Sequence, residues 1–220
     1  MILQGRLVFT GLAIDVGLVA LRVLTYPSLF GAPGFGATIG FLALSFFAAA
    51  IFIIRSLRSN LLSARLGVAT ASGLIGGAIL IAHLALENFG GRIGEDWRLT
   101  VLVMLTTFGL WFSSGWRSTH ENSSLVAGAV AGCWAALVSV IPAITFGFIG
   151  MYFDIPSCAY VATWPEYIQS GSYDPQAFAI ANTFDAATTH MSTALILGSI
   201  LGGAGRFVAS LRTRSPSHEE

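Results

Sequence analysis

Residues 125–148 read LVAGAVAGCWAALVSVIPAITFGF, a stretch of 24 residues without Asp, Glu, Lys, Arg or His. As a helix it extends about 36 Å, which exceeds the roughly 30 Å hydrocarbon core of a bilayer. Pro142 lies inside the stretch and predicts a kink, because proline removes a backbone hydrogen bond. This stretch therefore predicts a transmembrane helix.

Five further apolar runs accompany it. The six predicted spans are residues 7–26, 35–54, 66–86, 99–116, 125–148 and 185–206. Hydrophobic residues form 55% of the chain and charged residues 10%, against roughly 25% charged in soluble domains. Six spans leave room only for short loops. The sequence predicts an all-α integral membrane protein, a six-helix bundle forming one domain over residues 1–211.

The arginines indicate the orientation of the bundle, since cytoplasmic loops are enriched in basic residues. All eleven basic residues of the chain are Arg. One side of the predicted bundle holds Arg6, Arg55, Arg58, Arg65, Arg117, Arg206, Arg212 and Arg214. We therefore expect both termini in the cytoplasm, residues 212–220 as a polar cytoplasmic tail, and a multi-pass location in the inner membrane. Residues 7–26 show no small-residue cleavage site and are interpreted as a membrane helix.

Residues 154–174 form the longest predicted loop. The loop carries Tyr160, Trp164, Tyr167 and Tyr173, and such rings favour the headgroup layer. Asp174 followed by Pro175 predicts a helix start. The helix after it is too long for one perpendicular crossing, so we expect its first two turns outside the membrane and its outer boundary near Asp185.

Three Gly-x-x-x-Gly pairs predict close helix packing. They are Gly73 and Gly77, Gly128 and Gly132, and Gly198 and Gly202. The same faces would suit a homo-oligomer or another membrane protein, and the lipid bilayer is the remaining expected partner.

Several function classes are excluded. The chain has no Lys, so it holds no retinal Schiff base and no nucleotide-binding loop with its Lys. Net charge is zero and no basic patch suggests nucleic acid. Cys133 and Cys158 belong to no metal or haem-attachment motif. No catalytic motif is visible. An intramembrane aspartate pair is also not expected, because Asp15 should lie near the bilayer centre and Asp185 near its surface.

Ionisable residues inside the spans are the candidate functional residues, since a bilayer makes them costly. They are Asp15, Arg22, His83, Glu87, Asp185 and His190. We expect Arg22, His83 and His190 in one layer, with Glu87 and Asp185 just above it. His83 and Glu87 share a helix face directed into the bundle, whereas Asp185 and His190 lie about 140° apart around their helix.

Four interpretations of these residues remain open. The first is purely structural hydrogen bonding between helices. The second is a transport or proton pathway, with Asp15 at the floor of an outward cavity and Arg22, His83 and His190 on its walls. The third is a b-type haem held by His83 and His190. The fourth is a transition-metal site formed by His83, Glu87 and His190, with Asp185 as an optional further ligand. The predicted function is a small channel-like or transporter-like protein or a non-catalytic subunit of a membrane complex. A haem- or metal-binding protein is the alternative.

Overall fold

The computed structural model describes residues 2–32, 34–58, 65–89, 97–118, 124–153, 162, 165–172 and 174–213. Its helices are α1 (Ile2–Thr25), the 3-10 helix η1 (Pro27–Gly31), α2 (Phe35–Arg58), α3 (Arg65–Phe89), α4 (Trp97–Arg117), α5 (Leu125–Phe153), α7 (Pro165–Ser170) and α8 (Pro175–Thr213). Within these residues six helices are long and apolar enough to cross a membrane, and no strand occurs. The expected all-helical architecture with six membrane-capable helices is confirmed.

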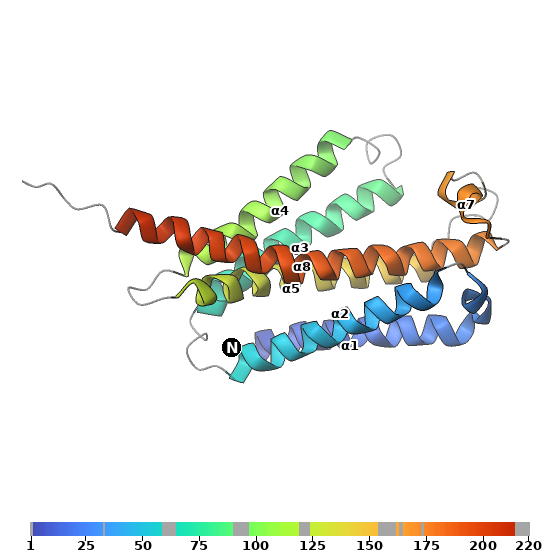
Figure 1. Ribbon diagram of the computed structural model, residues 1–220, viewed down its shortest axis with the longest axis horizontal. Coiled ribbons are helices and arrows are strands. Elements are labelled where there is room, and N and C mark those ends of the chain that lie inside the picture. Colours follow the sequence, from blue (N-terminus) through green and yellow to red (C-terminus); the bar gives the residue numbers. More distant parts are fainter. Residues whose placement is uncertain are drawn as a thin grey trace, which may run out of the picture.

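The helix α5 forms the centre of the bundle. It contacts α1, α3, α4 and α8, and most of its length is buried. Figure 1 shows α5 and α8 side by side, with α1 and α2 on one flank and α3 and α4 on the other. A helix that is apolar all around its circumference suits a central position, and α5 has this composition. Residues 125–148, which lie in α5, therefore form the core of the fold.

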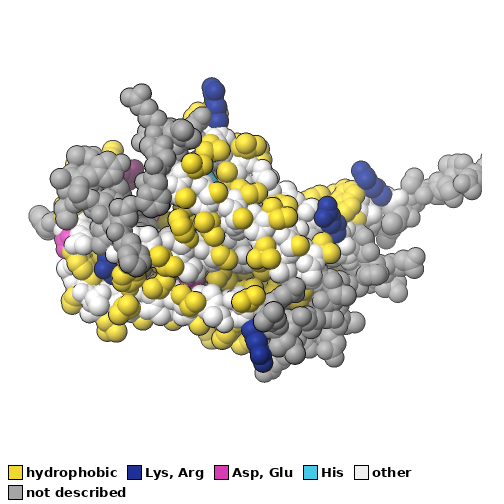
Figure 2. Space-filling view, turned by 180° about the vertical axis from the view of Figure 1, so that it is seen from behind, with side chains coloured by type: hydrophobic (Ala, Val, Ile, Leu, Met, Phe, Trp, Pro, Cys, Tyr) yellow, Lys and Arg dark blue, Asp and Glu magenta, His cyan; other side chains and the backbone are white. Residues whose placement is uncertain are grey.

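Large apolar side chains cover the outside of the bundle. Leu24 is 78% exposed, Leu105 66% and Phe47 65%, and Figure 2 shows hydrophobic side chains spread over the described part of one face. Monomeric soluble proteins rarely expose continuous apolar surface of this extent. The surface therefore supports a multi-pass membrane protein.

One half of the bundle is packed through glycines of α4, α5 and α8. This glycine seam consists of Gly115, Gly128, Gly132, Gly198, Gly202 and Gly205. A Cβ atom added at Gly132 or Gly202 would overlap backbone atoms of the neighbouring helix. Gly73 and Gly77 similarly face α5. All three predicted glycine pairs thus pack inside the chain, so a protein partner would need another surface.

The start of α1, the end of α8 and Arg117 at the end of α4 all lie at one end of the bundle (Figure 1). We call this the Arg117 end. The opposite end, where α1 finishes next to Tyr26, is the Tyr26 end. At the Tyr26 end, Asp174 Oδ1 accepts hydrogen bonds from the backbone N–H groups of Gln176 and Ala177 at 3.0 Å. This N-cap confirms the predicted helix start at Pro175. Ser28 donates to Asp174 Oδ2 at 3.0 Å, and the Tyr26 hydroxyl lies 3.3 Å from the same oxygen.

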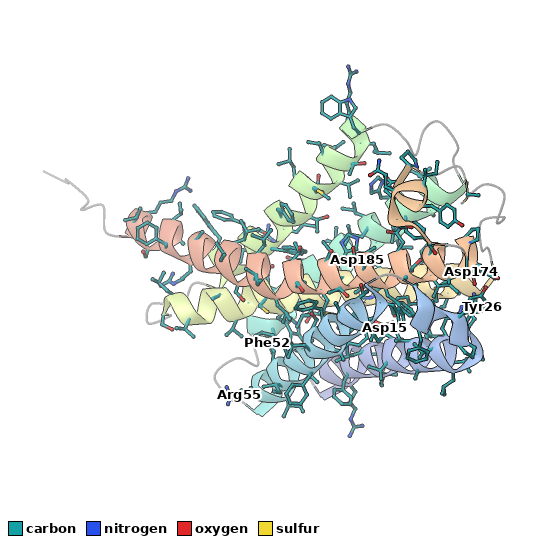
Figure 3. The ribbon with its side chains drawn as sticks, turned by 45° about the vertical axis from the view of Figure 1, so that its right-hand side comes forward. Asp15, Tyr26, Phe52, Arg55, Asp174 and Asp185 are labelled. Atoms are coloured by element: carbon teal, nitrogen blue, oxygen red, sulfur yellow. The ribbon has the colours of Figure 1, made fainter. Side chains whose placement is uncertain are left out.

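The contact between Tyr26 and Asp174 fixes the register of α1 against α8. Asp15 precedes Tyr26 by eleven residues and Asp185 follows Asp174 by eleven residues, so each lies about 16 Å along its helix from this contact. Figure 3 shows both at similar positions along the bundle. The expectation of a central Asp15 and a superficial Asp185 is therefore wrong, because the first turns of α8 run beside α1 rather than beyond it.

The predicted aromatic loop falls mostly outside the described residues. Tyr160, Trp164 and Tyr173 are among the residues that the structure does not describe, as is the tail 214–220. Tyr167 lies on α7, where its ring packs edge-on against Phe178 with 5.5 Å between ring centroids. The short helix α7 is therefore attached to the first turn of α8.

Candidate solute-binding cavity

A cavity of about 450 Å³ lies between α3, α4, α5 and α8. Its lining is mainly aliphatic and aromatic, with six polar residues: His83, Glu87, Thr100, Asn182, Thr183 and His190. On α5 the cavity covers residues 140–151, whereas the glycine seam covers residues 128–136. On α8 the cavity covers residues 179–190 and the seam 198–205. The cavity therefore occupies the Tyr26 half of the bundle and ends where the seam begins.

His83 and Glu87 are neighbours on the α3 wall. His83 Nε2 lies 3.2 Å from Glu87 Oε1, and the two side chains are 9% and 41% exposed. The expected shared helix face and the inward direction of His83 are confirmed. The other ring nitrogen, Nδ1, is buried and has no hydrogen-bond partner within the described part of the chain.

His190 lies on the α8 wall of the same cavity. His190 is exposed although it lies in this lining, so part of its surface is open. Asp185 is exposed and is not part of the lining. This agrees with the helical spacing, which separates Asp185 from His190 by about 140°. The structure thus brings together His83, Glu87 and His190 but leaves Asp185 outside.

Asp15 lies on the other side of α5. Its carboxyl Oδ1 is 2.6 Å from the hydroxyl of Thr145, and the residue is 0% exposed. Thr145 is separated by about 200° around the helix from Gly147, which lines the cavity. Asp15 is not among the lining residues. The expected cavity with Asp15 at its floor is therefore not formed, since α5 stands between them.

Arg22 also lies away from the cavity. Its Nη2 donates to the Met151 carbonyl at 3.3 Å, and its guanidinium carbon is 4.8 Å from the centre of the Tyr152 ring. Arg22 lies four residues from Tyr26, whereas His190 lies sixteen residues from Asp174. These positions differ by about 18 Å along the bundle. The expected common layer of Arg22, His83 and His190 is therefore wrong.

Sequence reasoning also missed part of the lining. Thr100 and Met104 bring α4 into the cavity wall. Gly147 and Gly150 of α5 line it too, and a Cβ atom added at either would meet no atom within 4 Å. These two glycines follow Pro142 and belong to no Gly-x-x-x-Gly pair. Glycines without a close partner are a signal for open space, but only the structure separates them from the seam glycines.

The metal hypothesis gains no support from the geometry. Over the residues that the structure describes, no group of three or more His, Cys, Asp or Glu side chains is placed to hold a metal ion. His83 and His190 still share one cavity, which is the arrangement that the haem hypothesis requires. Chemically, the cavity offers a mainly apolar interior with polar side chains on its α3, α4 and α8 walls.

Over the described residues, the fold and the cavity define an all-helical bundle with six membrane-capable helices, compatible with a multi-pass membrane protein, in which one half is closed and the other half hollow. No protein family, no curated protein and no solved structure matches the chain. The function is therefore argued from this geometry alone.

Proposed function

We propose that this chain is a small inner-membrane carrier that receives a solute in the cavity between α3, α4, α5 and α8. The observation that carries the proposal is the division of the bundle into a hollow half and a closed half. A channel open on both sides would need a continuous path, whereas the glycine seam brings the backbones of α4, α5 and α8 together below the cavity. A cavity accessible from one side is the arrangement expected of a carrier in one of its two states.

The arginine distribution gives the direction of opening. Arg55, Arg117, Arg206 and Arg212 lie toward the Arg117 end, which the positive-inside rule assigns to the cytoplasm. The cavity then faces outward. His83, Glu87 and His190 are the solute-binding residues in this proposal. Asp15, Arg22 and Asp185 lie outside the cavity and make no direct contact with the solute.

Cysteine accessibility tests the two states without knowledge of the solute. Gly147→Cys, in a chain that also carries Cys133→Ala and Cys158→Ser, places a thiol on the open wall of the cavity. A membrane-impermeant maleimide is expected to modify it from the outer side. Gly109→Cys in the same background is the matched control, because Gly109 is exposed on α4 and an added Cβ there meets no atom within 4 Å.

Native Cys133 tests for the second state of a carrier, in which the seam opens toward the cytoplasm. It is buried in the seam, with its Cα 3.1 Å from the position of a Cβ added at Gly198. In inside-out vesicles of the Cys158→Ser chain, the same maleimide is expected to modify Cys133 slowly as the seam opens. Modification of Gly147→Cys from outside, with Cys133 never reached, would replace the carrier by a static binding subunit of a membrane complex.

A second candidate function is a b-type haem protein, because His83 and His190 line one cavity from two helices. An absorption spectrum of protein purified in mild detergent tests it. A Soret band in the wild type that is absent in His190→Ala would replace the carrier proposal. A colourless wild type, with haem supplied during expression, would end the haem candidate.

A further inference from the structure

The cavity opens sideways between α4 and α8. The two helices touch through Gly115 and Gly202 and through Phe112 and Gly205, all toward the Arg117 end, and they diverge toward the Tyr26 end (Figure 1). Lining residues at this divergence are exposed: Met104 is 46% exposed, and Asn182 and Ala186 are exposed as well. In a membrane-spanning bundle this flank faces lipid chains. A ligand dissolved in the bilayer therefore reaches the cavity without crossing the headgroup layer above it.

Counting Asp, Glu, Lys and Arg, the described lining residues carry negative charge alone. Glu87 is the only Asp, Glu, Lys or Arg among the described lining residues. Its Oε1 lies 3.2 Å from His83 Nε2, and an ionised carboxylate has a second oxygen that accepts hydrogen bonds. The described lining thus presents a carboxylate and no Lys or Arg beside it.

The rest of the lining suits an apolar body. Leu80, Val103, Ile144 and Met151 line the cavity together with the rings of Phe146 and Phe148. Aromatic ring faces attract cations as well as apolar groups. The volume of about 450 Å³ lies in the range of small-molecule sites. Glu87 stands at the exposed rim of this space, 41% exposed, while the apolar walls continue toward the seam.

We propose that the ligand of this cavity is an amphipathic amine, with one protonated amino group at Glu87 and an apolar body between α4, α5 and α8. The amine enters laterally from the bilayer. This inference rests on the carrier function proposed above and names its substrate class. A neutral amphiphile fits less well, because it offers Glu87 no positive charge, and an anionic one would place two negative charges together.

Two probes with the same aromatic group, one an amine and one an alcohol, separate the effect of charge on binding from the effect of shape. We would measure equilibrium binding of 1-naphthylmethylamine and of 1-naphthalenemethanol to the full chain in phosphatidylcholine nanodiscs, with empty nanodiscs subtracted. Hydrogen bonds to charged groups contribute about 1.5–3 kcal/mol. The amine is therefore expected to bind at least about tenfold more tightly than the alcohol, since tenfold corresponds to about 1.4 kcal/mol.

Variants assign this preference to the cavity. Glu87→Gln is expected to lower the preference for the amine to about twofold or less, with binding of the alcohol unchanged. Glu166→Gln is the matched control, because Glu166 lies exposed on α7 outside the lining. Gly147→Leu is expected to abolish binding of both probes by filling the open wall, whereas Gly109→Leu on the lipid-facing side of α4 leaves both unchanged.

The outcomes separate the two proposals. Equal binding of both probes, or a preference for the amine that survives Glu87→Gln, would overturn the amine as ligand and leave the carrier proposal standing on the accessibility of Gly147→Cys and Cys133. Binding of neither probe, together with no modification of Gly147→Cys, would overturn both.

Discussion

The Thr145 hydroxyl joins Asp15 to the backbone of α5. It donates to Asp15 Oδ1 at 2.6 Å and lies 3.0 Å from the Ile141 carbonyl, an arrangement open to a three-centre hydrogen bond. Asp15 is 0% exposed, and a carboxyl buried in an apolar helix is costly without such a partner.

Asp15→Asn tests this hydrogen bond. The Asn side-chain oxygen is able to accept from Thr145 in place of the carboxyl oxygen, so we expect a change in unfolding free energy of less than about 1 kcal/mol and unchanged binding of amine in the cavity. Asp15→Leu leaves Thr145 without this partner and is expected to cost about 1–3 kcal/mol. Thermal unfolding in detergent measures both. Loss of cavity binding in Asp15→Asn would contradict the separation of Asp15 from the cavity by α5.

Asp174 connects the end of α1 to the start of α8. Burial opposes its ionisation, but hydrogen bonds from the Ala177 backbone, the Ser28 hydroxyl, the Gln176 backbone and the Tyr26 hydroxyl hold the pKa of Asp174 below its ordinary value. A carboxyl with a lowered folded-state pKa stabilises the fold above its unfolded pKa of about 3.9. This contribution disappears as the pH falls through the folded-state pKa.

Substitution of Asp174 should therefore act in a pH-dependent way. Asp174→Ala removes the N-cap of α8 and is expected to cost about 1 kcal/mol at pH 7. The difference from wild type should shrink as the pH is lowered below about 4, where the wild-type carboxyl becomes protonated. Thermal unfolding at several pH values measures this. Glu166→Ala, on α7, serves as the control for loss of one exposed carboxylate. A cost that stays constant down to pH 3 would contradict the assigned role of the charge.

At the scale of elements, glycines of α5 have two different effects: in the seam they allow close helix packing, and in the cavity they leave open space. Gly128 and Gly132 of α5 let α8 approach closely, whereas Gly147 and Gly150 leave space that no neighbour fills. Pro142 lies between these two glycine pairs. Because proline removes the hydrogen bond to the residue four positions earlier, α5 is least constrained where the packed half meets the hollow half.

Adjacent glycines of α8 provide a matched test of the seam. A Cβ atom at Gly202 would overlap Gly128 and Gly132, whereas a Cβ atom at Gly203 would meet only Ala129 Cβ at 3.8 Å. Gly202→Ala is expected to lower the unfolding free energy by about 1–3 kcal/mol through overpacking. Gly203→Ala should be neutral or stabilising by up to about 1 kcal/mol, since alanine favours helix. Equal effects of the two substitutions in detergent unfolding would argue against a tight seam.

At the scale of the whole molecule, the sequence predicted what depends on local pattern. Apolar runs predicted six helices, and the spacing of four residues predicted the pair of His83 and Glu87. Relative depth was not predictable, because it depends on how distant helices align. The alignment of Tyr26 with Asp174 moved Asp185 to the depth of Asp15, and the rotation of α5 placed Asp15 opposite the cavity. Neither the alignment of two distant helices nor the rotation of α5 against its neighbours is encoded by the pattern within a single helix.

The six membrane-capable helices of the described chain, if all of them cross, place both ends on one side of the membrane. This arrangement predicts the outcome of reporter fusions. If the Arg117 end is cytoplasmic, a fluorescent protein fused after Glu220 should fold and fluoresce, whereas alkaline phosphatase at the same position should remain inactive. A phosphatase inserted after Glu166 on α7, at the Tyr26 end, should be active. The reverse pattern would invert the orientation and place the cavity on the cytoplasmic side.

The position of α8 has a consequence for the order of assembly. It contacts α2, α4 and α5 and bonds to Tyr26 at the end of α1, and it leaves the ribosome after these helices. Before it is made, α1 joins the other flank of the bundle through α5, and the glycines of α5 that face α8 lack their partner. Insertion of α8 then completes the seam, one wall of the cavity and the Tyr26 contact in one step.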